Sequence, residues 1–87
     1  MSFSIRFVKR VEKDLKQLPS TTLQRIDSVI VALGITPRPL GCIKMAGTTS
    51  THRIRVGDYR IVYDIHDDTR IVVILIVAHR KEAYTGF

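Results

Sequence analysis

Two runs of alternating apolar and polar residues, separated by only two residues, constrain the fold of this chain most strongly. The runs cover residues 52–56 and 59–65, and the connection between them is Gly57-Asp58. A two-residue connection with glycine is typical of a tight β-hairpin. Counting outward from the turn predicts the cross-strand pairs, which are Val56 with Tyr59, Arg55 with Arg60, Ile54 with Ile61, and Arg53 with Val62.

The same register divides the hairpin into an apolar face and a basic face, because side chains alternate along a strand. The predicted core face carries Ile54, Val56, Tyr59, Ile61 and Tyr63, and His52 joins it by parity as a packed histidine. The opposite face carries Arg53, Arg55 and Arg60, with Asp64 able to offset part of the charge. Two like charges directly opposite each other lower the stability of a strand pair by about 0.2–1 kcal/mol.

Two interpretations of this basic face remain open. Three neighbouring guanidinium groups suit a phosphate, because arginine offers planar, bidentate donors. Alternatively, the face is a solvated surface on which arginine stems shield apolar atoms. Arg80 extends the cluster if the register of the last strand allows it.

The remaining chain predicts an α+β fold in the order β-α-α-β-β-β-β, forming a single domain over residues 1–87. Residues 3–7 alternate like a strand, and helical spacing over 8–18 and 23–33 predicts a helical hairpin. Ser20 is the expected N-cap of the second helix, and Gly34 its end. Residues 35–42 read as a loop, 43–45 as a short strand, and the apolar run 71–78 as a central strand covered on both faces. We therefore expect an N-terminal strand and a helical hairpin packed on an antiparallel sheet.

Charge and composition narrow the class of partner. Fourteen Lys and Arg residues against eight Asp and Glu give a net charge of +6, which favours nucleic acid, an acidic protein or an anionic membrane surface. The single cysteine, Cys42, cannot form an internal disulfide, and the three histidines lack zinc-site spacing. Neither a signal peptide nor a membrane-spanning run is present, so we expect a cytoplasmic protein without metal or cofactor.

Two sequence blocks resemble the paired signature of the RelE/ParE toxin superfamily, in its RelE branch. Residues 52–63 read HRIRVGDYRIVY, and residues 78–84 read AHRKEAY. Residues 44–47, KMAG, resemble the shorter lysine-containing segment that precedes these blocks. Together with the helical hairpin, the resemblance covers essentially the whole chain.

The resemblance implies a RelE-like toxin of a type II toxin–antitoxin system that enters the ribosomal A site and cleaves messenger RNA without metal. A RelB-like antitoxin would hold it inactive in a hetero-oligomeric complex. By position, Arg53 and Arg55 match the basic pair of this strand, and Arg60 matches the phosphate-binding arginine. Arg80 matches a late arginine proposed as acid or charge stabiliser, and Tyr84 a tyrosine that stacks on or orients the substrate. Lys44 and Lys81 are further expected RNA contacts.

The identity of the acid and base stays open at this point. The best-studied enzymes of this type carry lysines where this chain has Arg53 and Arg55, and arginine does not lose its proton in proteins. His79 is then the conventional acid–base candidate, because histidine changes charge near neutral pH, or it only supports Arg80. Two rival functions share the fold: a ParE-like gyrase poison that cuts no RNA, and a binding module without catalysis.

Overall fold

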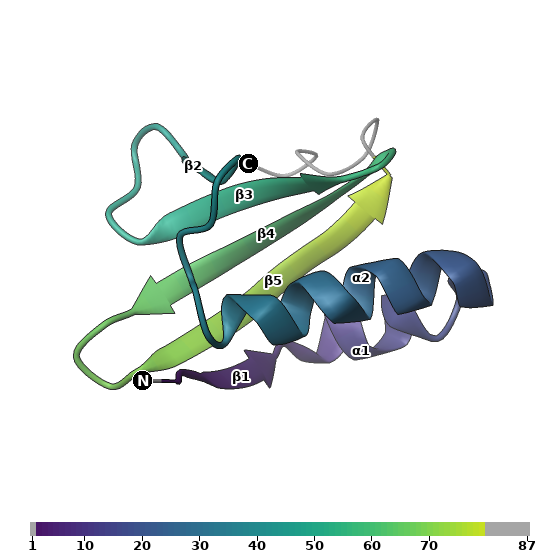
Figure 1. Ribbon diagram of the computed structural model, residues 1–87, viewed down its shortest axis with the longest axis horizontal. Coiled ribbons are helices and arrows are strands. Elements are labelled where there is room, and N and C mark those ends of the chain that lie inside the picture. The colour runs from purple at the N-terminus through teal and green to yellow at the C-terminus, as the bar shows by residue number, and fades with distance from the viewer. Residues whose placement is uncertain (1, 80–87) are drawn as a thin grey trace.

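A computed structural model describes residues 2–79 and shows a five-stranded sheet with two helices (Figure 1). The strands lie in the order β1-β5-β4-β3-β2. The α+β class and the predicted order of elements are confirmed. The elements are β1 (Ser4–Phe7), α1 (Lys9–Leu15), α2 (Ser20–Leu33), β2 (Ile43–Lys44), β3 (Thr51–Val56), β4 (Tyr59–His66) and β5 (Ile71–His79).

The sheet is mixed rather than wholly antiparallel. Strands β2 to β5 pair antiparallel as expected, whereas β1 lies parallel to β5, from Ser4 opposite Ile71 to Phe7 opposite Ile74. Parallel neighbours need a long crossover connection, and here the helical hairpin and three strands separate the two partners in sequence. Local patterning carries no information on a pair so distant along the chain.

The two helices follow from their apolar spacing, but the second begins differently from the prediction. Pro19 occupies the N-cap position and Ser20 is already helical, without a side-chain cap, so the assignment of Ser20 as N-cap is wrong. Proline has a fixed φ and lacks an N–H, which suits the start of a helix. The predicted end at Gly34 is confirmed, and the Gly34 carbonyl accepts a hydrogen bond of 2.6 Å from the Phe3 amide.

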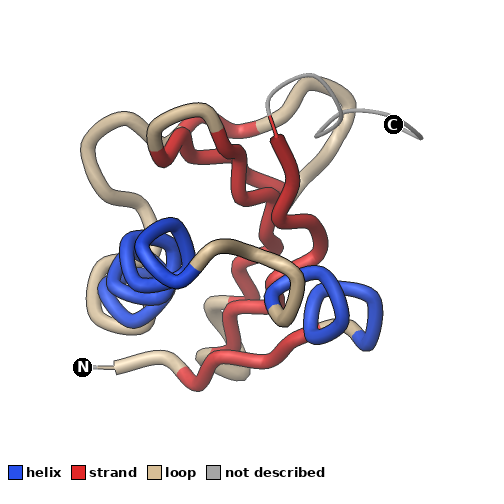
Figure 2. The backbone as a smooth tube through the Cα atoms, turned by 90° about the vertical axis from the view of Figure 1, so that its right-hand side faces the viewer, coloured by secondary structure: helices blue, strands red, loops and turns tan. Residues whose placement is uncertain are grey.

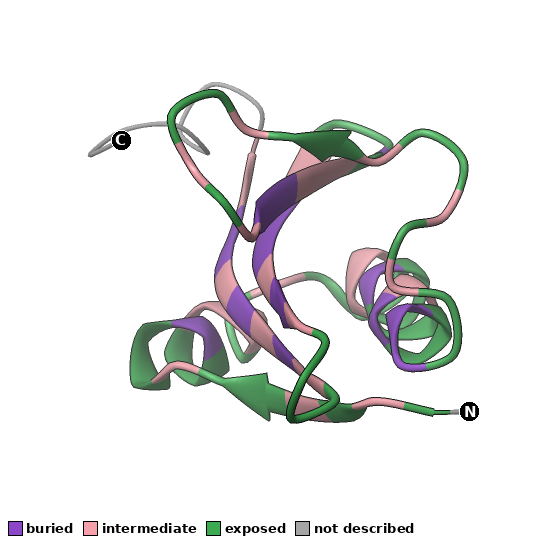
Figure 3. Cartoon of the chain, turned by 90° about the vertical axis from the view of Figure 1, so that its left-hand side faces the viewer, coloured by how far each residue is buried: buried purple, intermediate pink, exposed green. Residues whose placement is uncertain are grey.

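One hydrophobic core lies between the helices and one face of the curved sheet, which curls partly round α2 (Figure 2). The buried members are Val11 from α1, Ile26, Ile30 and Leu33 from α2, and Val56, Ile61, Tyr63, Ile65, Val72, Ile74 and Val77 from the sheet. Buried positions recur along the middle strands (Figure 3). Strand β5 is central, as predicted, but its second face is only partly covered, because Ile71, Val73 and Leu75 are half-buried.

Within residues 2–79, no helix combines the length and apolar character needed to cross a membrane.

Candidate functional site

The β3–β4 hairpin has the register that the sequence predicts. Val56 pairs with Tyr59, Arg55 with Arg60, Ile54 with Ile61, and Arg53 with Val62. Gly57 has a φ of +61°, as the first central residue of a type II′ turn requires, so the turn depends on a residue without a Cβ atom. The hairpin therefore presents Arg53, Arg55 and Arg60 on one face.

These three arginines meet at one pocket of about 240 Å³, which we call the arginine pocket. Arg53 and Arg60 are half-buried and Arg55 is exposed. The remaining wall comes from β3 itself and from the segment around β2, with Gly41, Ile43 and Ile54 as lining residues. The arginines thus line a concave site, which is where an anion could be held by several donors at once.

Two of the arginines donate to backbone carbonyls of the hairpin turn. The Nε of Arg55 donates to the Gly57 carbonyl at 2.9 Å, and Nη1 of Arg60 donates to the Tyr59 carbonyl at 3.3 Å. Within the described chain, neither forms an ion pair with a carboxylate. Asp64 accepts a 2.6 Å hydrogen bond from the Thr51 hydroxyl instead. The backbone contacts orient the guanidinium groups without neutralising them, so the pocket retains a positive potential.

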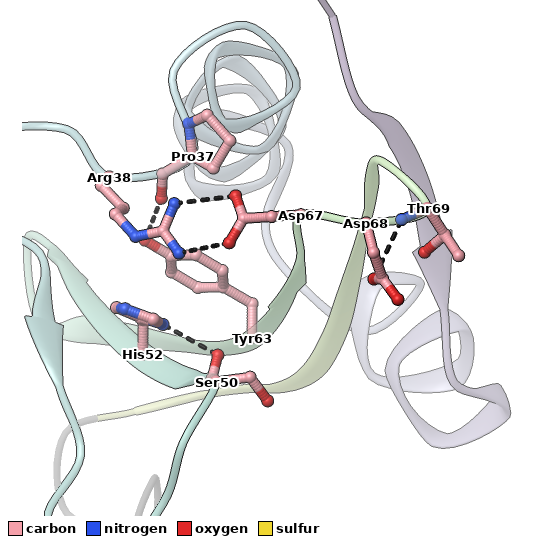
Figure 4. Close-up of polar contacts among 8 residues, drawn as sticks. All are labelled: Pro37, Arg38, Ser50, His52, Tyr63, Asp67, Asp68 and Thr69. Atoms are coloured by element: carbon pink, nitrogen blue, oxygen red, sulfur yellow. Dashed lines mark hydrogen bonds and ion pairs between the residues drawn. The ribbon is translucent and has the colours of Figure 1, made fainter.

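The loop that leads into the pocket wall is tied by two polar contacts to β4 and to the turn that follows it (Figure 4). The buried Tyr63 hydroxyl donates to the Pro37 carbonyl at 2.8 Å. Arg38 forms a bidentate pair with Asp67, with distances of 3.1 and 2.8 Å. Sequence reasoning placed Tyr63 in the core but missed this anchor, although a buried tyrosine hydroxyl generally finds a partner.

The side chains that form these contacts also have shifted pKa values. Burial, with the neighbouring Cys42 as a second cause, raises the pKa of Tyr63 well above its ordinary value of 10. The hydrogen bond from Arg38 lowers the pKa of Asp67, and the same contact raises the pKa of Arg38. Tyr63 therefore stays protonated and able to donate throughout the neutral and mildly alkaline range.

His52 is a packed residue, as its parity predicts. Its side chain is 5% exposed, it stacks on Tyr63 with ring centroids 5.9 Å apart, and its Nδ1 lies 2.8 Å from the Ser50 carbonyl. It faces the core and not the arginine pocket.

Lys44 does not join the arginines. It pairs with His52 across β2 and β3, which places it on the other face from Arg53. Its Nζ donates to the Thr48 carbonyl within the same turn. The expectation that Lys44 contacts the same ligand as the arginines has no support in this placement.

His79 also lies on the other face. It pairs with Tyr59 while Arg60 pairs with Ala78, and the rings of His79 and Tyr59 meet edge to face at 5.7 Å. His79 lines a separate pocket beside α1, together with Arg10 and other residues. The structure thus separates His79 from the arginine pocket. The other expected residues, Arg80, Lys81 and Tyr84, lie outside the described residues.

No group of three or more His, Cys, Asp or Glu side chains that could hold a metal ion occurs among residues 2–79. The side chains that line the arginine pocket are cationic or apolar. Their chemistry is therefore that of binding and charge stabilisation.

Comparison with known proteins identifies close similarities over nearly the whole chain. Residues 5–84 match the family described as the ParE toxin of the type II toxin–antitoxin system parDE. Toxin RelG of Mycobacterium tuberculosis is 37% identical over 90 aligned residues, which cover 97% of this chain and 98% of RelG. Toxin RelE3 of Methanocaldococcus jannaschii is 33% identical over 87 residues, which cover 95% of this chain and 97% of RelE3.

The fold is also shared with a solved structure. In the RelE–RelB complex of Pyrococcus horikoshii, the matching chain superposes with a TM-score of 0.83 at 30% identity. The match covers 95% of the present chain and 100% of the other.

Proposed function

This chain belongs to the family of ParE toxins of type II toxin–antitoxin systems and is a RelE-like toxin, and we propose that it acts as an endoribonuclease on ribosome-bound messenger RNA. The observation that carries the proposal is the arginine pocket, in which three guanidinium groups from two paired strands line one concavity. A phosphodiester is the ligand that such a set of bidentate donors fits best.

The proposed reaction uses the nucleophile that RNA itself supplies. The 2′-oxygen attacks the adjacent phosphorus, the bond from phosphorus to the 5′-oxygen breaks, and the two fragments end in a 2′,3′-cyclic phosphate and a 5′-hydroxyl. One proton leaves the 2′-hydroxyl and one reaches the 5′-oxygen, so no water is consumed in this step. The protein must hold the sugar and phosphate in line and stabilise the charge that builds on the phosphorane oxygens.

Within that reaction, the arginines act as electrostatic clamps. Arg60 and Arg55 face each other and form no ion pair with a carboxylate of residues 2–79, so both can turn their donors to the phosphate oxygens. Arg53 lies on β3 two residues before Arg55 and is the third arginine that lines the pocket. Arginine does not accept a proton at neutral pH, so these groups do not supply the general base. Arg80 and Tyr84 keep the roles that the family resemblance implies, as charge stabiliser and substrate-orienting residue.

A separate antitoxin protein is the proposed regulatory partner. The similar chain from Pyrococcus horikoshii was solved in complex with RelB. The net charge of +6 gives an acidic or amphipathic partner an electrostatic attraction to this surface. Co-expression with the neighbouring small open reading frame should relieve growth arrest and yield a co-purifying complex. Failure of both adjacent gene products to bind or to relieve arrest would contradict this assignment.

A gyrase-poisoning activity is the alternative, and the family description, which names ParE, is the observation in its favour. One experiment separates the two functions: brief expression in cells, followed by mapping of RNA ends and of DNA breaks in the same cultures. We expect new 5′-hydroxyl ends within translated messages and no rise in double-strand breaks. Double-strand breaks without new RNA ends would contradict the ribonuclease function and support gyrase poisoning.

A further inference from the structure

An exposed isoleucine stands next to the arginines on the same side of the sheet. Ile43 in β2 pairs directly with Arg53 in β3, so the two side chains share a face. Ile43 is 52% exposed and nevertheless lines the arginine pocket. The pocket thus combines a cationic side with an apolar wall.

The position of this wall is held by its surroundings. β2 is hydrogen-bonded to β3, and directly after it the Met45 amide donates to the Thr51 carbonyl at 2.9 Å. The preceding loop is tied down by the contacts of Tyr63 with Pro37 and of Arg38 with Asp67. Ile43 therefore lies at the pocket on an edge strand whose position is fixed by these contacts. Packing of the hydrophobic core does not require an apolar residue at this position.

The size of the pocket leaves room for a ligand larger than a phosphate. Its volume is about 240 Å³, whereas an apolar cavity of about 150 Å³ is large enough to bind benzene. A phosphate held by the arginines would leave room for a ring-sized group beside it. A nucleotide has both parts: an anionic phosphate for the guanidinium groups and a flat base whose face can cover an aliphatic side chain.

We propose that Ile43 forms the apolar wall of a nucleobase subsite, which receives the base of a nucleotide flanking the phosphate in the arginine pocket. The proposal rests on the proposed ribonuclease function and adds to it a place for one base. Ile43 makes no bond to reacting atoms and acts as a positioning residue. Covering one to two of its methylene groups predicts a loss of roughly 4- to 15-fold in cleavage rate for Ile43→Ala.

A thermodynamic cycle tests this contact. Ribosomes are programmed with a defined message, and with versions in which the nucleotide on one side or the other of the cut phosphate is abasic. Single-turnover cleavage of each message is measured for the wild type and for Ile43→Ala. If Ile43 covers that base, removal of the base costs the wild type more than it costs the variant, so the two losses are less than additive on one side of the cut.

Two further variants complete the design. Ile35→Ala removes an equally large side chain that is 69% exposed but does not line the pocket, so it should behave as wild type on every message. Ile43→Val keeps an apolar wall and should recover most of the lost rate. Fully additive losses on both sides of the cut would overturn the nucleobase subsite. If the wild type cuts no message at all, the ribonuclease function itself fails, which is a different result.

Discussion

Arg55 and Arg60 lie directly opposite each other on β3 and β4, and no carboxylate within residues 2–79 forms an ion pair with either of them. Such a pair is mildly unfavourable for folding, because like charges repel across a strand pair. The same arrangement provides donors that need not be released from an ion pair before they bind a phosphate.

Arg60→Ala should abolish most of the cleavage while preserving the fold. Loss of one preorganised donor to a charged transition state typically lowers the rate on the order of 100- to 1000-fold. The free energy of unfolding should stay unchanged or rise slightly, because the repulsion from Arg55 disappears. The measurements are single-turnover cleavage of ribosome-bound message and urea unfolding.

Arg6→Ala is the matched control for this variant. Arg6 is exposed on β1, at the sheet edge opposite β2, so its removal changes the net charge equally without touching the pocket. We expect nearly wild-type cleavage. Equal losses for Arg6→Ala and Arg60→Ala would show that overall charge, and not the pocket, drives activity.

Arg55→Lys should keep part of the activity, and Arg55→Ala much less. A lysine retains the positive charge but loses bidentate geometry and the bond from Nε to the Gly57 carbonyl that orients the side chain. We expect a loss of about tenfold for lysine and on the order of 100-fold for alanine. Rates of the two variants that agree within error would indicate that geometry, not charge, is what Arg55 contributes.

His79→Gln should retain cleavage, in contrast to the expectation from residue type alone. His79 pairs with Tyr59 on the face away from the arginines, so it is poorly placed to exchange protons at their ligand. The variant should keep the wild-type dependence of the single-turnover rate on pH. A large rate loss together with a changed pH profile would restore His79 as the acid or base.

Alkaline pH should destabilise the protein through Tyr63. Because its pKa is raised in the folded state, Tyr63 stays protonated there, while in the unfolded chain it ionises above about pH 10. Above about pH 10 the unfolded state therefore binds fewer protons than the folded state. The contribution of Tyr63 to the free energy of unfolding is complete below about pH 10 and is lost as the pH rises through the raised pKa.

Tyr63→Phe provides the test. The variant should be about 1–3 kcal/mol less stable at neutral pH, because the Pro37 carbonyl loses its donor. Its stability should decline less steeply above about pH 10, because only the wild type loses the contribution of Tyr63 there. Urea unfolding at neutral and alkaline pH measures both effects, and identical pH slopes for the two proteins would contradict the assignment.

Local patterning of the sequence was sufficient to predict much of the arginine pocket. The two-residue turn at Gly57 sets the register of β3 and β4, and parity then assigns Arg53, Arg55 and Arg60 to one face and His52 to the other. Turn geometry and alternation operate over a few residues, so they can be read along the chain. The same reasoning placed the ends of most elements within one or two residues.

The amino-acid sequence by itself determined the hairpin register, the two helices and the charge of the exposed face, because each depends on neighbours along the chain. Only the tertiary structure decided that β1 lies parallel to β5, that Ile43 lines the arginine pocket, and that His79 and Lys44 lie away from it. Each of these depends on which strands meet side by side, and strand neighbours are set by packing among segments that are distant in sequence.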